Sequence, residues 1–149
     1  MIEGVLVNRL LQIHDERGKI MHMMSSSSPY FDKFGEIYFS FSHPGVVKAW
    51  HLHSKMTLNY AVVSGKLKLV LFDDRDDSPT SGQIEELYLT PDDHKIVTVP
   101  PGVWNGFKCV GNSDAILANL ATIPHDPHEI LRLPPQTSKI PYSWDIVHK

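Results

Sequence analysis

Residues 66–72 read Lys-Leu-Lys-Leu-Val-Leu-Phe, with a leucine at every second position. Successive side chains of a β-strand point to opposite faces, so Leu67, Leu69 and Leu71 share one face of any strand formed here. A Ser-Gly pair at residues 64–65 precedes the segment and favours a turn. The pattern predicts a strand of an antiparallel sheet, with a leucine core face and a wetter opposite face.

The rest of the chain repeats this pattern in short segments that turn residues separate. No window of twelve or more residues keeps apolar residues at helical spacing without an intervening Pro or Gly. We therefore expect less than about 15% helix, against a base rate near one third. Short strands at regular spacing predict an all-β sandwich or barrel. The expected strands are residues 5–13, 19–24, 36–42, 46–53, 57–64, 66–73, 83–89, 95–99, 106–110 and 114–121.

The composition indicates one globular domain spanning residues 1–149. A hydrophobic fraction of 42% and a charged fraction of 21% exclude a long disordered chain and a coiled coil. The net charge of −3 gives no basic surface for nucleic acid or for an anionic membrane. Cys109 has no partner for an internal disulfide, and no apolar run is long enough to span a membrane. Since the N-terminus lacks a basic leader followed by an apolar stretch, we expect a cytoplasmic protein.

Two segments lack a clear strand pattern. Residues 25–28 are four serines followed by Pro29, which predicts a surface loop. From residue 124 onward the chain carries five prolines, too many for a central strand. We expect this tail to run over the surface of the domain.

The densest group of reactive side chains lies in residues 48–53, Lys-Ala-Trp-His-Leu-His. His51 and His53 are two apart and share one strand face with Ala49, so both imidazoles should point into an apolar barrel mouth. Imidazole titrates near neutral pH, which suits it to proton transfer and to metal binding. Two histidines on one inward face are costly unless they are used, so we interpret the pair as functional. The alternative is a pair of hydrogen-bonded structural histidines at the rim.

The histidine pair also has the spacing of the first cupin motif, in which a glycine precedes it by six residues, as Gly45 does here. That motif continues with a glutamate, but Thr57 and Leu58 stand at its positions. The later strand that supplies a further histidine has Asn105 instead. Two histidines provide half of a catalytic zinc or iron site. We therefore expect no bound metal, and we rank a metal-dependent cupin enzyme last among our hypotheses.

Five short motifs then occur in the order found in one cupin branch. The chain resembles the RmlC-type cupins, the nucleotide-sugar 4-keto-6-deoxyhexose 3,5-epimerases, over roughly residues 13 to 129. The resemblance implies an all-β cupin jelly roll, a homodimer, a nucleotide-sugar substrate and no cofactor. The matching motifs are Asp-Glu-Arg-Gly at 15–18, Gly-Val-Val-Lys-Ala-Trp-His at 45–51, Val-Val-Ser-Gly at 62–65, Asp-Arg-Asp-Asp-Ser-Pro-Thr at 74–80 and Pro-Gly-Val-Trp-Asn-Gly-Phe at 101–107.

The resemblance assigns a role to each candidate site residue. It makes His51 the catalytic base, with Lys48 in place of the family's arginine on the side of the developing oxyanion. His125 stands near the position of the family's general-acid tyrosine. A regular strand would place Lys48 and His51 on opposite faces, so a β-bulge or a strand end is required between them. The substrate-binding roles fall to Arg17, Glu36, His53 and Asn105.

The sugar 3,4-ketoisomerases of the same cupin group offer a second resemblance. Residues 48–55, Lys-Ala-Trp-His-Leu-His-Ser-Lys, are similar to their R-G-x-H-A-H-K motif. Tyr38 lies near their tyrosine on the preceding strand. This alternative gives catalytic roles to Tyr38 and His53.

Both enzyme classes use the same acid–base chemistry. A ketone at C4 acidifies the C–H bonds at C3 and C5, so a base can remove a proton and a donor can return it to the enolate. Epimerisation returns the proton to the same carbon from the opposite face, whereas ketoisomerisation moves the carbonyl. We predict an isomerase that epimerises an NDP-4-keto-6-deoxyhexose. A ketoisomerase and a non-catalytic cupin that binds a sugar nucleotide are the alternatives.

Overall fold

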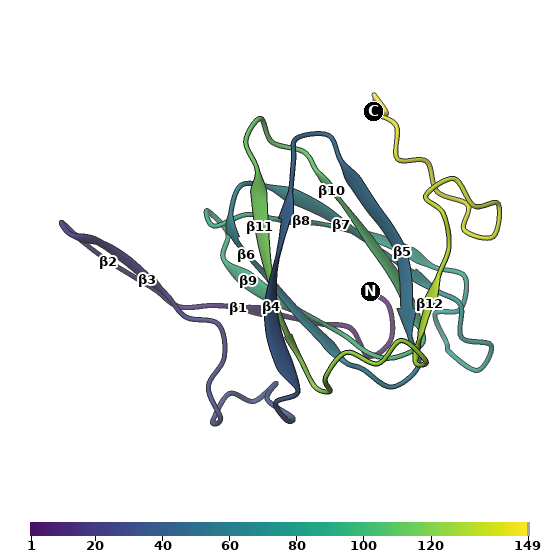
Figure 1. Cartoon of the computed structure of the whole chain (residues 1–149), viewed down its shortest axis with the longest axis horizontal. Coiled ribbons are helices and arrows are strands. Elements are labelled where there is room, and N and C mark those ends of the chain that lie inside the picture. Colours follow the sequence, from purple (N-terminus) through teal and green to yellow (C-terminus); the bar gives the residue numbers. More distant parts are fainter. Residues whose placement is uncertain (149) are drawn as a thin grey trace.

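Twelve strands and no helix make up residues 1–148, the part of the chain that the computed structural model describes (Figure 1). The expected all-β class and low helix content are confirmed. The strands are β1 (Leu6–Arg9), β2 (Gln12–Asp15), β3 (Gly18–Met21), β4 (Glu36–Ser42), β5 (Val47–His53), β6 (Leu58–Ser64), β7 (Leu67–Asp73), β8 (Ile84–Leu89), β9 (Lys95–Val99), β10 (Val103–Cys109), β11 (Ala115–Ala121) and β12 (Ile130–Arg132).

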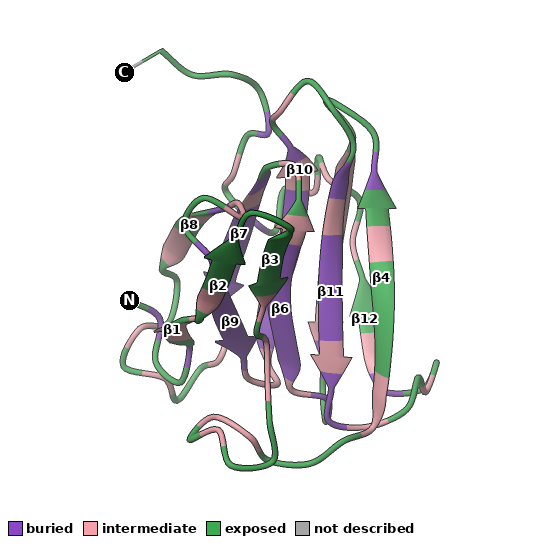
Figure 2. Ribbon diagram, turned by 90° about the vertical axis from the view of Figure 1, so that its left-hand side faces the viewer, coloured by how far each residue is buried: buried purple, intermediate pink, exposed green. Residues whose placement is uncertain are grey.

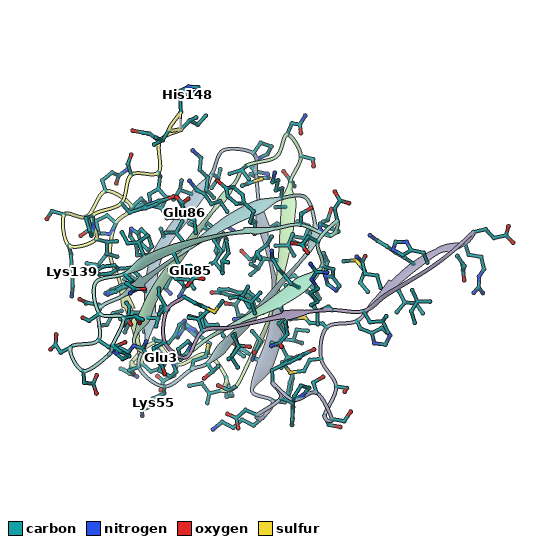
Figure 3. The ribbon with its side chains drawn as sticks, turned by 180° about the vertical axis from the view of Figure 1, so that it is seen from behind. Glu3, Lys55, Glu85, Glu86, Lys139 and His148 are labelled. Carbon is teal, nitrogen blue, oxygen red and sulfur yellow. The ribbon has the colours of Figure 1, made fainter. Side chains whose placement is uncertain are left out.

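The strands form two five-stranded sheets that pack against each other. One sheet has the order β1-β9-β6-β11-β4 and the other has the order β12-β5-β10-β7-β8. Every neighbouring pair is antiparallel. β2 and β3 pair with each other in a separate hairpin that extends away from the two sheets (Figures 1 and 3). The architecture is the antiparallel sandwich that the strand spacing predicts.

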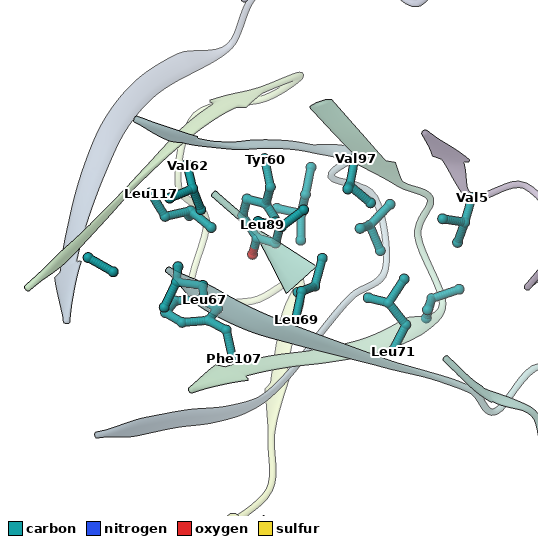
Figure 4. Packing of buried hydrophobic residues seen from close by; sticks show 14 of the residues in the cluster. Val5, Tyr60, Val62, Leu67, Leu69, Leu71, Leu89, Val97, Phe107 and Leu117 are labelled. Atoms are coloured by element: carbon teal, nitrogen blue, oxygen red, sulfur yellow. The ribbon is translucent and has the colours of Figure 1, made fainter. Parts of the chain in front are cut away.

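The core between the sheets is built on the leucines of β7. Leu67, Leu69 and Leu71 each have 0% exposure, as their alternation predicts. They belong to one cluster with Phe107 of β10 and Leu117 of β11 (Figure 4). Each such side chain contributes about 1.5–3 kcal/mol when fully buried, so this layer is a main source of adhesion between the sheets. Figure 2 shows β6 and β11 buried along most of their length and the edge strand β4 largely exposed.

The opposite face of β7 differs from the expectation. Val70 and Phe72 are 0% and 7% exposed, so the prediction of a wetter face is wrong at these positions. The reason is the C-terminal tail, whose Ile140 and Trp144 pack in one cluster with Val70. A central strand is buried on both sides when a later segment covers its outer face. Trp50 and Trp104 complete this second cluster, at 1% and 2% exposure.

Several strand boundaries also differ from the sequence pattern: the expected strands 19–24 and 106–110 are Gly18–Met21 and Val103–Cys109. The expected strand 5–13 is divided between β1 and β2, because the chain leaves the sandwich after Arg9 and starts the hairpin at Gln12. The short strand β12 lies in the proline-rich tail, where no strand was expected. It pairs with β5 at the edge of its sheet, a position at which flanking prolines cost few ladder hydrogen bonds.

His94 fixes the base of the hairpin. The backbone N–H of Leu10 donates to the carbonyl of His94 over 2.9 Å. Nε2 of His94 lies 2.7 Å from the carbonyl oxygen of His22, to which it donates. The two legs of the hairpin are therefore held at one residue, while the apolar side chains of Ile13 and Ile20 farther out are 48% and 60% exposed.

Candidate active site

A cavity of about 390 Å³ lies between the sheets at the end where β4 and β5 face each other. β4 contributes Glu36, Tyr38 and Ser40, whose spacing of two places them on one strand face. β5 belongs to the other sheet and forms the facing wall (Figure 1). Further lining residues are Lys48, His51 and His53 of β5, and also Met56, Tyr60, Phe107, Leu117, His125, Ile130 and Arg132.

A β-bulge in β5 brings Lys48 to the same wall as His51. The register pairs Asn105 with His51 and Phe107 with Lys48, so three steps along β5 oppose two steps along β10. The extra residue in β5 shifts the alternation of its side chains by one. The sequence required such an irregularity for the two residues to act together, and the structure contains it.

Lys48 is held by β4 across the cavity. Its Nζ donates to Oγ of Ser40 over 3.0 Å and to the carbonyl oxygen of Phe41 over 2.5 Å. Both partners are neutral, so the ammonium charge is not cancelled by a carboxylate in residues 1–148. A cation in this position favours an anionic group in the cavity.

His51 is neutral at physiological pH. Burial lowers its pKa to about 4, and the positive charge of Arg132 and the electrostatic interaction with His53 act in the same direction. Arg132 is close because it lies directly opposite His51 in the pairing of β12 with β5. A neutral imidazole has a free lone pair and can accept a proton, which is the state a general base needs.

His53 is bonded to a buried carboxylate beside the cavity. Its Nδ1 donates to Oε1 of Glu129, and the two side chains are 9% and 2% exposed. Oε2 of Glu129 accepts the backbone N–H groups of Lys55 and Met56, at 3.1 and 3.2 Å. Burial raises the pKa of Glu129, but these three hydrogen bonds outweigh it, and the net pKa is lowered. The carboxylate is therefore ionised at neutral pH.

Tyr38 and His125 complete the group of titratable side chains around the cavity. Tyr38 of β4 faces His51 from the other sheet, and its hydroxyl oxygen accepts a hydrogen bond of 3.0 Å from Nδ2 of Asn119. His125 lies in the connection between β11 and β12. The structure thus gathers six of the eight candidate residues around one cavity: Glu36, Tyr38, Lys48, His51, His53 and His125.

Asn105 lies behind the cavity wall. It is 0% exposed, its Nδ2 donates to the carbonyl oxygen of His51 over 3.0 Å, and its Oδ1 accepts from the Tyr60 hydroxyl over 3.0 Å. Burial raises the pKa of Tyr60 well above its usual value, so the phenol keeps its proton and donates it. The Asn105 side chain therefore links the backbone of β5 at His51 to the Tyr60 hydroxyl on β6.

Arg17 does not line the cavity of its own chain. It sits at the tip of the β2–β3 hairpin, where its side chain is 87% exposed and Nη2 forms a 2.6 Å ion pair with Asp15. The hairpin extends away from the two sheets (Figure 3).

Three site residues were not identified from the sequence: Tyr60, Glu129 and Arg132. Arg132 and Glu129 lie in the proline-rich tail, which was assigned to the surface. Pairing of β12 with β5 brings them beside the two histidines. Glu129, two residues after the Asp-Pro pair at 126–127, was the one signal available in this segment. A carboxylate is a common hydrogen-bond partner that orients an imidazole.

The described residues form neither a metal-binding cluster nor a membrane-spanning helix. No three His, Cys, Asp or Glu side chains in residues 1–148 are grouped so that they could hold a metal ion. The described chain also contains no helix long and apolar enough to cross a membrane.

Comparison with known proteins identifies relatives along the whole chain. The family model for dTDP-4-dehydrorhamnose 3,5-epimerase matches residues 1–149. The spore coat polysaccharide biosynthesis protein SpsL of Bacillus subtilis (strain 168) is 30% identical over 145 residues, which cover 97% of this chain and 91% of that protein. The probable low-salt glycan biosynthesis epimerase Agl13 of Haloferax volcanii is 32% identical over 137 residues, which cover 90% and 85% of the two chains.

Solved structures show the same fold. The crystal structure of a dTDP sugar isomerase from Desulfovibrio desulfuricans G20 is 44% identical, covers 96% of this chain and 92% of that chain, and superposes with a TM-score of 0.94. More distant structures, at 19% and 22% identity and a TM-score of 0.86, share the fold and are complexes with dTDP and with dTDP-4-keto-L-rhamnose. The chain therefore belongs to the dTDP-4-dehydrorhamnose 3,5-epimerase family, the RmlC-like sugar epimerases with a cupin fold.

Proposed function

We propose that the protein epimerises an NDP-4-keto-6-deoxyhexose at C3, C5 or both. The observation that carries this proposal is the distribution of acid–base groups over two facing walls. A neutral imidazole, His51, lies on β5, and a phenol, Tyr38, lies on β4 of the opposite sheet, with His125 in the connecting loop. Inversion at carbon requires removal of a proton from one face and return to the other, which two facing walls allow.

The proposed reaction begins with proton abstraction by His51. Nε2 or Nδ1 of the imidazole takes the proton from a carbon next to the C4 ketone, and the electron pair of that C–H bond forms the enolate. The negative charge moves to the carbonyl oxygen, where the ammonium of Lys48 would stabilise it. His125 returns a proton to the opposite face of the same carbon, as the resemblance to the family implies. We assign substrate-binding roles to Glu36 and His53, both of which line the cavity.

Deuterium wash-in tests this proposal. The protein is incubated with dTDP-4-keto-6-deoxyglucose in D₂O, and proton NMR follows the C3 and C5 signals. We expect exchange in the wild type and its loss in His51→Asn. His128→Asn is the matched control, because the side chain of His128 is 94% exposed. If the wild type exchanges no deuterium with any 4-keto-6-deoxy sugar nucleotide, both the epimerase and the ketoisomerase proposals fail, and the result favours a non-catalytic sugar-nucleotide-binding cupin.

A 3,4-ketoisomerase is the second candidate, because His53 and Tyr38 line the same cavity as His51. The two activities give different products: epimerisation leaves the carbonyl at C4, whereas ketoisomerisation places it at C3. Carbon NMR of the product distinguishes them directly. Tyr38→Phe should impair a ketoisomerase more than His125→Ala does, and the order should be reversed in an epimerase.

We further propose that the active protein is a homodimer. The exposed strand β4 carries Phe39 and Phe41, each 57% exposed, and the hairpin carries Ile20, 60% exposed. Large apolar side chains exposed on an edge strand and on a projecting hairpin are typical of an interface. In a dimer the projecting hairpin, with Arg17 at its tip, would contact the second copy. Light scattering should give about twice the 16.9 kDa chain mass. Ile20→Lys should shift it to the monomer, and a monomeric wild type would contradict the proposal.

A further inference from the structure

Glu129 has an unusual environment for a carboxylate. The residue is 4% exposed, and no Lys or Arg in residues 1–148 forms an ion pair with it. Its charge is held by three hydrogen bonds, from Nδ1 of His53 and from the backbone N–H groups of Lys55 and Met56. Burying a carboxylate is costly unless it is hydrogen-bonded; Oε2 of Glu129 satisfies the two backbone N–H groups, and Oε1 is left for the imidazole of His53.

This environment determines which nitrogen of His53 carries the proton. An ionised carboxylate only accepts hydrogen bonds, so Nδ1 of His53 must be the donor. In the neutral imidazole Nε2 then keeps its lone pair. His53 lines the cavity, and no hydrogen bond within the described chain uses its Nε2. The pair therefore presents a proton acceptor to the cavity, with a negative charge behind it that stabilises the imidazolium once the proton is taken.

The neighbouring histidine lacks this support. No hydrogen bond to the His51 ring is formed within residues 1–148, and the cation Arg132 lies opposite it. The guanidinium of Arg132 lies opposite His51, whereas the carboxylate of Glu129 is hydrogen-bonded to Nδ1 of His53. The two imidazoles share one wall but differ in the charge that faces them.

From this geometry we infer that His53 is a second proton-transfer residue of the cavity and that Glu129 is its positioning residue. The inference rests on the proposed epimerase or isomerase function and adds a proton acceptor to it. Nε2 of His53 takes a proton from a carbon next to the substrate ketone, while the electron pair of the broken C–H bond forms the enolate. The proton then leaves the imidazolium for an enolate carbon, which restores the ketone and the neutral His53.

The substitution Glu129→Gln tests the pair without removing its hydrogen bonds. The backbone N–H groups of Lys55 and Met56 need an acceptor, so they fix the amide oxygen of the glutamine on their side. The amide nitrogen then faces Nδ1 of His53 and donates to it. His53 must change to the tautomer with its proton on Nε2, which can no longer accept a proton from the substrate.

The first measurement is the ¹⁵N NMR spectrum of the histidine side chains, which needs no substrate. We expect His53 to carry its proton on Nδ1 in the wild type and on Nε2 in Glu129→Gln. Asp114→Asn is the matched control, because Asp114 pairs with His43 over 2.9 Å on the surface, with side chains 48% and 80% exposed. A wild-type His53 protonated on Nε2 would overturn the inference.

The second measurement is deuterium wash-in with dTDP-4-keto-6-deoxyglucose at C3 and C5. Loss of a general base usually costs about a hundred- to ten-thousand-fold in rate. We expect Glu129→Gln to lower kcat for exchange at C3 or C5 by at least about a hundredfold, with KM nearly unchanged, and Asp114→Asn to retain wild-type exchange. His53→Gln should give the same loss, because its amide keeps a donor for Glu129 and so preserves the fold.

The outcomes separate this inference from the proposed function. If the wild type exchanges deuterium and Glu129→Gln exchanges equally fast with the tautomer changed, the role of His53 in proton transfer is wrong and the epimerase proposal stands. If the wild type exchanges none, both the function and the role of His53 fail. If either variant unfolds at a temperature close to the wild type yet loses exchange, the loss is not due to unfolding and supports the inference.

Discussion

Acidification should destabilise the folded protein through His51, and the structure sets the size of the effect. The folded pKa is about 4, against 6.5 for the free side chain. Below pH 6.5 the unfolded chain takes up a proton that the folded chain refuses, so this contribution is fully present above pH 6.5 and is lost as the pH falls towards 4. Between pH 7.5 and pH 5.0 the loss is at most about 2 kcal/mol, and the partial exposure of the ring reduces it.

Urea unfolding of the wild type and of His51→Asn at pH 7.5 and pH 5.0 measures this loss. Asparagine does not titrate, and the other ionisable groups are common to both proteins, so the difference between the two pH dependences isolates His51. We expect the wild type to lose about 1–2 kcal/mol more than the variant. In an Arg132→Gln background this difference in pH-dependent stability loss should be smaller, because removal of that cation raises the pKa of His51. Equal pH dependences for wild type and His51→Asn would refute the reasoning.

The remaining predictions concern catalysis, ligand binding and the core. His51→Asn should slow deuterium exchange into the substrate by about a hundred- to ten-thousand-fold without lowering the melting temperature at pH 7.5. A nucleoside diphosphate such as dTDP should raise the melting temperature at millimolar concentration, and Lys48→Met should reduce that shift. No shift with any nucleoside diphosphate would count against a nucleotide-sugar ligand. Leu69→Ala should cost about 2–5 kcal/mol in urea unfolding, because Leu69 is 0% exposed in the core.

Much of the fold follows from the period of the apolar residues. The alternation of Leu67, Leu69 and Leu71 identifies the core face of β7, and the turn residues separate most of the strands correctly. The break between β1 and β2 leaves no such trace, because the apolar pattern continues through Leu10 and Leu11 while the chain leaves the sandwich. Long-range pairing decides that boundary, and local sequence carries no information about it.

The site was predictable where its residues lie on one strand, and less so elsewhere. His51 and His53 follow from their spacing of two, whereas the bulge that turns Lys48 inward depends on the register with β10. Glu129 and Arg132 reach the site only because β12 pairs with β5, and a three-residue edge strand between prolines gives almost no local signal. Tertiary pairing therefore determined which of the tail residues belong to the site.

Burial of the outer face of β5 under the C-terminal tail compensates for the polar residues on its inner face. The inner face of β5 presents Lys48, His51 and His53 to a cavity, so that end of the sandwich gains little from apolar packing between the sheets. Trp50, which alternates with these residues, points the other way and is 1% exposed under the C-terminal tail. Burial of an aromatic side chain of this size contributes several kcal/mol at about 25 cal/mol per Å². The tail thus provides β5 with apolar burial on its outer face, which leaves the inner face free for polar residues.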